Sequence, residues 1–344
     1  MAVRVWSILA ICLGLLGRDG RANAAEGVEA FYGSHNLRIV IGHEVGTGFD
    51  LYARLLARFM GRFLPAHPNA IPENMVGVAG LAAANWLYNA APKDGSTIAI
   101  FAHTAPFDPL LGDSAGRFDG SKFTWIGNMD SVVGLCGVWD AAGVKRFDEL
   151  FDKEILFGAA GAGTAGPLTQ FPTALRNLLG AKIKLIQGYK GSADIRLAMA
   201  RGEVHGVCGI PLSTVKTEWR DDYASGRFKP ILQLGHDRDP QLGDVPHIYD
   251  YAKTDADRKL FDLIFGLQAI GRPFAAPPDI PEDRMMALRE AFEATLRDES
   301  FKAEASRLQL DLTPMSGDDV SKFVRGVYAS PPDLVQRAKA AVRP

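Results

Sequence analysis

The chain has 344 residues, a formal net charge of −2 and 47 % hydrophobic residues. The near-neutral balance and the lack of a long basic run argue against a nucleic-acid-binding protein. The length is greater than one typical core accommodates and favours two lobes.

The N-terminus has the pattern of a secretory signal peptide. Arg4 precedes an uncharged apolar run over residues 5–16, and residues 22–24 read Ala-Asn-Ala, an A-x-A cleavage pattern. The run is too short to span a bilayer, which needs about 20 residues. We therefore predict that residues 1–24 are removed before Ala25 and that the mature chain is exported to the periplasm with a net charge of −4.

The first half of the chain alternates short apolar runs with helical patterns. Strands are expected at residues 37–42, 96–102, 123–129 and 132–139, and helices at 49–64 and 81–91. Residues 69–75 lead to the second of these helices and are assigned no element, and residues 104–122 form a less regular stretch. This alternation is typical of an α/β sheet.

A second alternating series follows. Strands are expected at residues 154–160, 181–189, 204–210 and 228–235, with helices at 166–180, 192–202 and 212–226 between them. The rest of the chain looks helical, and the segment 280–298 places Met285, Leu288, Phe292 and Leu296 on one helix face.

The segment "GAGTAG" places Gly161, Gly163 and Gly166 in the G-x-G-x-x-G spacing of a dinucleotide-binding turn. Such a site needs an acidic residue at the end of the next strand, and that strand ends in Gln187, Gly188 and Tyr189. The dinucleotide interpretation is therefore set aside. A packing turn remains open, but a turn that aims backbone N–H groups at a small anion accounts better for the segment.

Three further strand-to-helix turns have the same character. They are "GHEVGTGFD" at residues 42–50, where Asp50 can cap the next helix, "NMVGVAG" at 74–80 and "GYKGSAD" at 188–194, where Lys190 adds a charge. Ligands of open α/β sheets bind beyond the carboxyl ends of the strands, where these turns fall. The four turns therefore predict two walls that face one cleft.

Other site chemistry is sparse. The seven histidines form no zinc-type pair, although His43 and His103 follow predicted strands, and the chain has no G-x-S-x-G nucleophile elbow. The sequence therefore predicts no catalytic residue, no metal and no cofactor, and a protein that is not an enzyme. Cys136 and Cys208, which survive signal removal, could form a disulfide in an oxidising compartment; we slightly favour two small core residues.

These turns give the chain a resemblance to the Bug-type periplasmic receptors of tripartite tricarboxylate transporters. The resemblance rests on residues 46–54, on 74–80, on the "APKDGSTIAI" strand entry, on "GYKGSADIRLAMARGEVHG" and on "APPDIPEDRMMALREAF", and it covers most of residues 36–310. The chain departs from the family pattern at two places, and both put the identity of the ligand in question. His205 stands where the family usually has the aspartate of G-x-V-D, and "GHEV" stands where the family commonly has an aromatic residue early in the first turn.

The resemblance implies a two-lobed α/β clamshell, the type II periplasmic-binding-protein fold, with a helical C-terminal tail on the first lobe. Residues 25–136 and 236–344 would form lobe 1 and residues 137–235 lobe 2, hinged near Val138 and Leu234. The family grips carboxylates largely through backbone N–H groups. The implied ligand-binding residues are Gly46, Thr47, Gly48, Asp50, Gly77, Gly80, His103, Thr104, Gly161, Gly163, Thr164, Ala165, Tyr189 and Lys190.

The function implied is capture of a small carboxylate by a monomeric receptor, which delivers it to a membrane permease. A periplasmic sensor that feeds a membrane signalling partner would use the same site and remains an alternative. An exported enzyme acting on a small carboxylate is a third interpretation, which the lack of a nucleophile or metal set disfavours.

Overall fold

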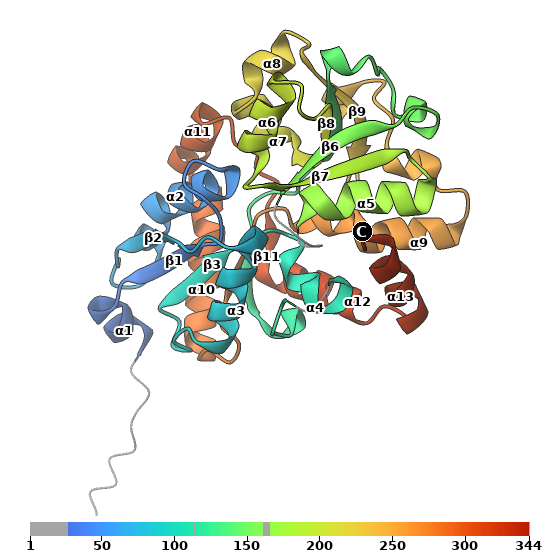
Figure 1. Ribbon diagram of the computed structural model, residues 1–344. Coiled ribbons are helices and arrows are strands. Elements are labelled where there is room, and N and C mark those ends of the chain that lie inside the picture. Colours follow the sequence, from blue (N-terminus) through green and yellow to red (C-terminus); the bar gives the residue numbers. More distant parts are fainter. Residues whose placement is uncertain (1–26, 113–114, 161–165, 344) are drawn as a thin grey trace, which may run out of the picture.

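The computed structural model describes residues 27–112, 115–160 and 166–343. Two β-sheets, each covered by helices, form the two halves of the molecule (Figure 1). Among the described residues no helix is long and apolar enough to cross a membrane.

The first sheet has the strand order β11-β4-β10-β3-β1-β2. β1 pairs in parallel with β2 and β3, whereas β10 and β11 return from the C-terminal part of the chain and pair antiparallel. The strands are β1 (Leu37–Ile41), β2 (Ala70–Asn74), β3 (Thr97–Ile100), β4 (Thr124–Asn128), β10 (Pro273–Ala276) and β11 (Met315–Ser316).

Helices on this sheet bury one apolar face each. In the predicted C-terminal helix, α10, the side chains of Leu288, Phe292 and Leu296 are buried and Met285 is half-buried, as the spacing predicts. The helices of this half are α1 (Val28–Ser34), α2 (Gly48–Met60), α3 (Leu81–Asn89), α4 (Asp108–Leu111), α10 (Glu282–Arg297), α11 (Glu299–Arg307) and α12 (Gly317–Tyr328).

The second sheet has the strand order β7-β6-β8-β5-β9. β6 is parallel to β7 and β8, and β5 is antiparallel to β8 and β9. Its elements are β5 (Gly134–Trp139), β6 (Ile155–Ala160), α5 (Pro167–Leu179), β7 (Ile183–Tyr189), α6 (Ser192–Ala200), β8 (Gly206–Pro211), α7 (Leu212–Thr217), α8 (Arg220–Ala224) and β9 (Phe228–Leu234).

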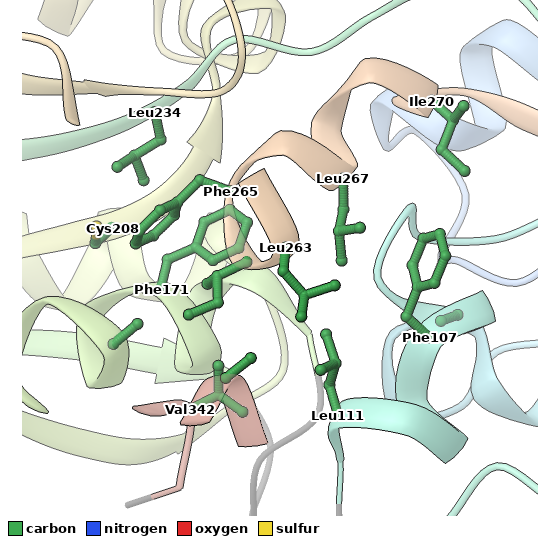
Figure 2. Close-up of a cluster of buried hydrophobic side chains, with 14 of the residues drawn as sticks. Phe107, Leu111, Phe171, Cys208, Leu234, Leu263, Phe265, Leu267, Ile270 and Val342 are labelled. Atoms are coloured by element: carbon green, nitrogen blue, oxygen red, sulfur yellow. The ribbon is translucent and has the colours of Figure 1, made fainter. Parts of the chain in front are cut away.

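A continuous apolar core joins the two halves. α9 (Asp255–Ile264) and the 3₁₀-helix η9 (Gly266–Ile270) place Leu263 and Leu267 between Phe171 of α5 and Phe107 of the first half (Figure 2). The last helix, α13 (Pro332–Ala341), contacts α4, α5 and α9. The C-terminal tail therefore packs on the first half through α10 to α12 and reaches the second half through α13.

Chain crossings between the halves lie side by side. The chain leaves the first sheet after Asn128 and enters the second at Gly134, so the boundary expected between residues 136 and 137 falls inside β5. The return crossing begins at Gly235, where an added Cβ would lie 3.3 Å from the Val132 carbonyl oxygen. Val138 itself is buried within β5.

Two local expectations differ from the structure. Residues 70–74, to which the sequence assigned no element, form the edge strand β2, which carries Pro72 because an edge strand can lack one ladder hydrogen bond. Cys136 and Cys208 are joined in a disulfide, which corrects the preference for unpaired core cysteines. The two residues are opposite each other in the antiparallel β5–β8 pair, and both are fully buried.

Candidate functional site

The turns singled out in the first half gather at one edge of its sheet. The turns follow β1, β2 and β3, which are parallel, so their carboxyl ends lie together. This places Gly46, Thr47, Gly48, Asp50, Gly77, Gly80, His103 and Thr104 at that edge.

The turn after β1 is shaped by a hydrogen-bond network around Asp50. Its carboxylate accepts hydrogen bonds from the Gly46 N–H (2.9 Å), from Arg54 Nε (2.9 Å) and from Asn74 Nδ2 (2.9 Å). Asn74 also donates to the His43 carbonyl oxygen. Burial alone would raise the pKa of Asp50, but these hydrogen bonds outweigh it and hold the pKa below its usual value. The carboxylate therefore fixes the path of residues 43–50.

Among the described residues, no side chain caps the N-terminus of α2. Thr47 occupies the N-cap position, but its hydroxyl donates to the Glu44 carbonyl oxygen at 2.8 Å. Asp50 is the third residue of the helix and accepts a hydrogen bond from the Gly46 N–H, which precedes the helix, so it does not cap the helix N–H groups as expected from the sequence. The first N–H groups of α2 lack intrahelical acceptors and can donate to an anion.

The turn after β2 is tightly packed and strained. Val78 and Ala79 adopt positive φ angles of 42° and 55°, which is costly for a β-branched residue. Gly80 has φ of 88°, and a Cβ there would lie 2.7 Å from Phe101 Cβ. Its N–H donates to the Gly77 carbonyl oxygen at 3.0 Å. Gly80 is thus used for close packing against β3.

Histidines 43 and 103 carry buried ring nitrogens without partners. No hydrogen bond is made by His43 Nδ1 or by either ring nitrogen of His103 within the described part of the chain. His103 is 2 % exposed, and the neighbouring Thr104 is also buried. Burial, with a smaller effect of Arg272, lowers the pKa of each histidine to about 3. Both rings are therefore neutral at physiological pH.

Arg272 is a site residue that the sequence analysis did not identify. It immediately precedes β10 and is 1 % exposed. Its guanidinium carbon lies 4.4 Å from the centre of the Phe49 ring and 5.0 Å from that of Tyr52. Nη2 contacts Ser213 Oγ of α7 at 3.3 Å, so this side chain links the two halves. The only sequence signal is a lone arginine at the start of the apolar run "PFAA".

The second half contributes fewer described candidates. Gly161, Gly163, Thr164 and Ala165 lie outside the described residues. Tyr189 is half-buried at the end of the edge strand β7, and burial raises its pKa. Lys190 is exposed, and its N–H donates to Asp194 at 3.2 Å. His205 precedes β8, at the opposite edge from the turns, and its Nδ1 accepts a hydrogen bond from the Leu156 N–H.

A separate cavity of about 610 Å³ lies between α5, α9 and α13. It is lined by Phe151, Asn177, Leu178, Leu179, Asp250, Tyr251, Lys253, Asp257, Leu260, Phe261 and Arg337. None of these residues belongs to the glycine turns. Within the described ranges, no three His, Cys, Asp or Glu side chains are placed to hold a metal ion.

Comparison with solved structures confirms the expected fold. The chain superimposes on a TctC solute-binding protein from Polaromonas (TM-score 0.64, 17 % identity, 88 % of this chain and 99 % of that one). The periplasmic binding protein BugD gives a TM-score of 0.68 at 21 % identity, covering 90 % and 98 % of the two chains. MatC from Rhodopseudomonas palustris, solved with bound malate, gives 0.65 at 17 % identity, covering 90 % and 99 %. The sequence matches no protein-family model and no curated protein.

Proposed function

We propose that this protein is an exported receptor of the tripartite tricarboxylate transporter type, which captures a small carboxylate between its two halves. The observation that carries the proposal is the shared fold over 88–90 % of the chain with TctC, BugD and MatC. One of these neighbours was solved with malate, and another R. palustris protein of this fold was solved with adipate. Aliphatic dicarboxylates are therefore the first ligands to test.

The proposed grip uses backbone N–H groups on both sides. On the first half these are the N–H groups at the start of α2, which no side chain caps. On the second half we assign the role to Gly161, Gly163, Thr164 and Ala165 from the sequence. Tyr189 and Lys190, at the end of β7, would border the ligand. Asp50 would act by holding the turn in place, because its carboxylate oxygens already accept hydrogen bonds.

Closure of the halves would convert ligand binding into a shape that a permease recognises. We place the hinge at residues 129–133 and at Gly235, because the chain crosses between the sheets there. The protein would act as a cofactor-free, non-enzymatic monomer in the periplasm, with residues 1–24 removed. N-terminal sequencing of the exported protein should begin at Ala25; a mature chain that retains residues 1–24 would contradict the leader assignment.

A thermal-shift screen of mono- and dicarboxylates tests the proposal. A ligand at 100 times its Kd should stabilise the folded state by about 2.7 kcal/mol and raise the melting temperature. Thr164→Tyr is designed to block the proposed site on the second half and should abolish the shift in melting temperature. If no carboxylate shifts the melting temperature, or the blocked variant responds like the wild type, the site is wrong. A receptor should leave its ligand chemically unchanged, so the NMR spectrum of the bound carboxylate should stay the same over hours. Conversion of the carboxylate to a product would indicate an enzyme.

A further inference from the structure

Arg272 stands where the two halves meet. Its guanidinium packs on the rings of Phe49 and Tyr52 in α2. Nη2 contacts Ser213 Oγ at the start of α7, and a Cβ added to Gly48 would lie 3.0 Å from the same nitrogen. A single charged side chain therefore lies directly beside the uncapped N-terminus of α2 and reaches across to the second half.

The charge of Arg272 is unusual because no carboxylate of the described residues forms an ion pair with it. Within the described chain its guanidinium makes two long hydrogen bonds, to Ser213 Oγ and to the Gly271 carbonyl oxygen, both at 3.3 Å, and Nε has no partner. The backbone N–H of Arg272 donates to Asn128 Oδ1 and to the Asp130 carbonyl oxygen. By contrast, Arg54 and Arg227 each donate to a buried aspartate at 2.9 and 2.8 Å. An arginine keeps its proton inside proteins, and a buried charge without a counter-ion is strongly unfavourable.

Nearby acids do not neutralise this charge by contact. The carboxylate of Asp130 accepts hydrogen bonds from Tyr52 Oη (3.1 Å) and Thr313 Oγ1 (2.9 Å), while its backbone carbonyl oxygen accepts the Arg272 N–H. Burial raises the pKa of Asp130 to about 6, and the same effect raises the pKa of Glu218. The charges of Asp130 and Glu218 act on Arg272 from a distance, and within the described residues neither carboxylate forms an ion pair with the guanidinium.

The unpartnered histidine nitrogens lie in the same place. His43 stacks on Phe49 with ring centres 3.9 Å apart, so both His43 and Arg272 contact this one aromatic ring. His103 is close enough to both groups for their charges to affect its ionisation. A neutral imidazole offers one N–H donor, and buried polar atoms normally find partners. An anion would satisfy Nε of Arg272 and an imidazole N–H together.

We propose that Arg272 binds the carboxylate of the ligand directly, with His43 and His103 as neutral hydrogen-bond donors around it. The site would thus combine backbone N–H groups with one charged anchor specific for an anionic group. This inference rests on the proposed receptor function and identifies Arg272 as the residue that makes the site specific for a negatively charged ligand. Because Ser213 of α7 covers the guanidinium, the ligand enters when α2 and α7 separate, and it then draws them together.

Calorimetric titration of Arg272→Gln tests the inference. The carboxylate that gives the largest thermal shift with the wild type is titrated, and sulfonates and phosphonates of equal chain length are included. We expect at least tenfold weaker binding, about 1.4 kcal/mol, and a loss of most of the salt dependence of the affinity. Arg272→Lys should recover part of the affinity, since it keeps the charge but not the planar fork.

The matched control is Arg289→Gln, because Arg289 is also largely buried but pairs with Asp318 at 2.7 Å. This control should lower the melting temperature of the unliganded protein and leave binding unchanged. Arg272→Gln should leave the unliganded melting temperature equal or higher, which a purely structural arginine would not do.

The outcomes separate the two proposals. If Arg272→Gln binds the carboxylate within threefold of the wild type, the anchor is overturned and the receptor function stands. If the wild type binds only sulfonates or phosphonates, in an Arg272-dependent way, the anchor stands and the carboxylate assignment falls. If no anion binds the wild type, both are wrong.

Discussion

Gly166 and Ala79, from opposite halves of the protein, meet so closely that a Cβ on Gly166 would lie 2.9 Å from the Ala79 Cβ. Gly166 is the residue before α5, and Ala79 is in the strained turn after β2. This contact brings a glycine turn of the second half against a turn of the first at the carboxyl ends of both sheets.

A side chain at Gly166 should therefore hinder closure. Gly166→Ala is expected to weaken carboxylate binding at least tenfold, because the added methyl group would meet Ala79. Gly180→Ala is the control: Gly180 also has a positive φ (75°, against 85° for Gly166), but a Cβ there meets no atom within 4 Å. Both variants should lose thermal stability through backbone strain. Equal affinities for the two variants would mean that the halves need not meet as they do here.

The Asp50 network should contribute to both stability and binding. Asp50→Ala removes the acceptor of the hydrogen bonds from Gly46, Arg54 and Asn74. It should lower the free energy of unfolding by about 2 kcal/mol, a value that already allows for the weaker contribution of the partly exposed Arg54. Because the pKa of Asp50 is lowered by folding, its contribution is present above its unfolded pKa and is lost as pH falls through the folded value.

Chemical denaturation of Asp50→Ala beside Glu73→Ala checks this prediction. Glu73 pairs with Arg38 on the surface, with exposures of 46 % and 37 %, so its loss should change stability by no more than about 0.5 kcal/mol. Carboxylate affinity should fall only in Asp50→Ala. Equal effects of the two substitutions would show that the network is unimportant.

Asp130 should make the protein less stable as pH rises. Its folded pKa of about 6 exceeds the ordinary value of about 3.9, so its ionisation opposes folding progressively between pH 4 and 7, by about 2 to 3 kcal/mol in total. Asp130→Asn should therefore be more stable relative to the wild type at pH 7.5 than at pH 4.5.

Urea denaturation at the two pH values measures this difference. Asp279→Asn, at an exposed acid paired with Lys93, provides the control for the same substitution at the surface. A pH-independent difference for Asp130→Asn would show that Asp130 is ionised as readily in the folded state as in the unfolded state.

The Cys136–Cys208 disulfide should stabilise the second half. The bond closes a loop with a sequence separation of 72 residues, for which the chain-entropy estimate is roughly 4 kcal/mol. We expect dithiothreitol to lower the melting temperature of the wild type but not that of the Cys136→Ala/Cys208→Ala variant. Alkylation of the unreduced, denatured protein at both cysteines would refute the bond.

Local patterns sufficed for most elements of this fold. Apolar runs predicted β1, β3 and β6, and a helical face predicted α10, because these signals lie within one element. β2 escaped prediction because Pro72 and Glu73 interrupt its apolar character, and only pairing along β1 reveals the strand. The disulfide likewise depends on the register of β5 and β8.

The candidate site also has features that the local sequence indicates and features that depend on residues distant in the sequence. The glycine turns are local features, so the sequence indicated where N–H groups gather. The roles of their members were not visible: Asp50 bonds to Gly46 and Asn74, and Gly80 packs on Phe101. Arg272 could not be found at all, since its meaning comes from Phe49, Tyr52 and Ser213, which are distant in sequence.

A crystal structure of the protein with the carboxylate that stabilises it most would test the central claim most directly. We predict that the ligand lies between the N-terminus of α2 and the start of α7, with one carboxylate oxygen within hydrogen-bonding distance of the Arg272 guanidinium. A ligand bound instead in the cavity between α5, α9 and α13, or at the surface away from the glycine turns, would contradict the account.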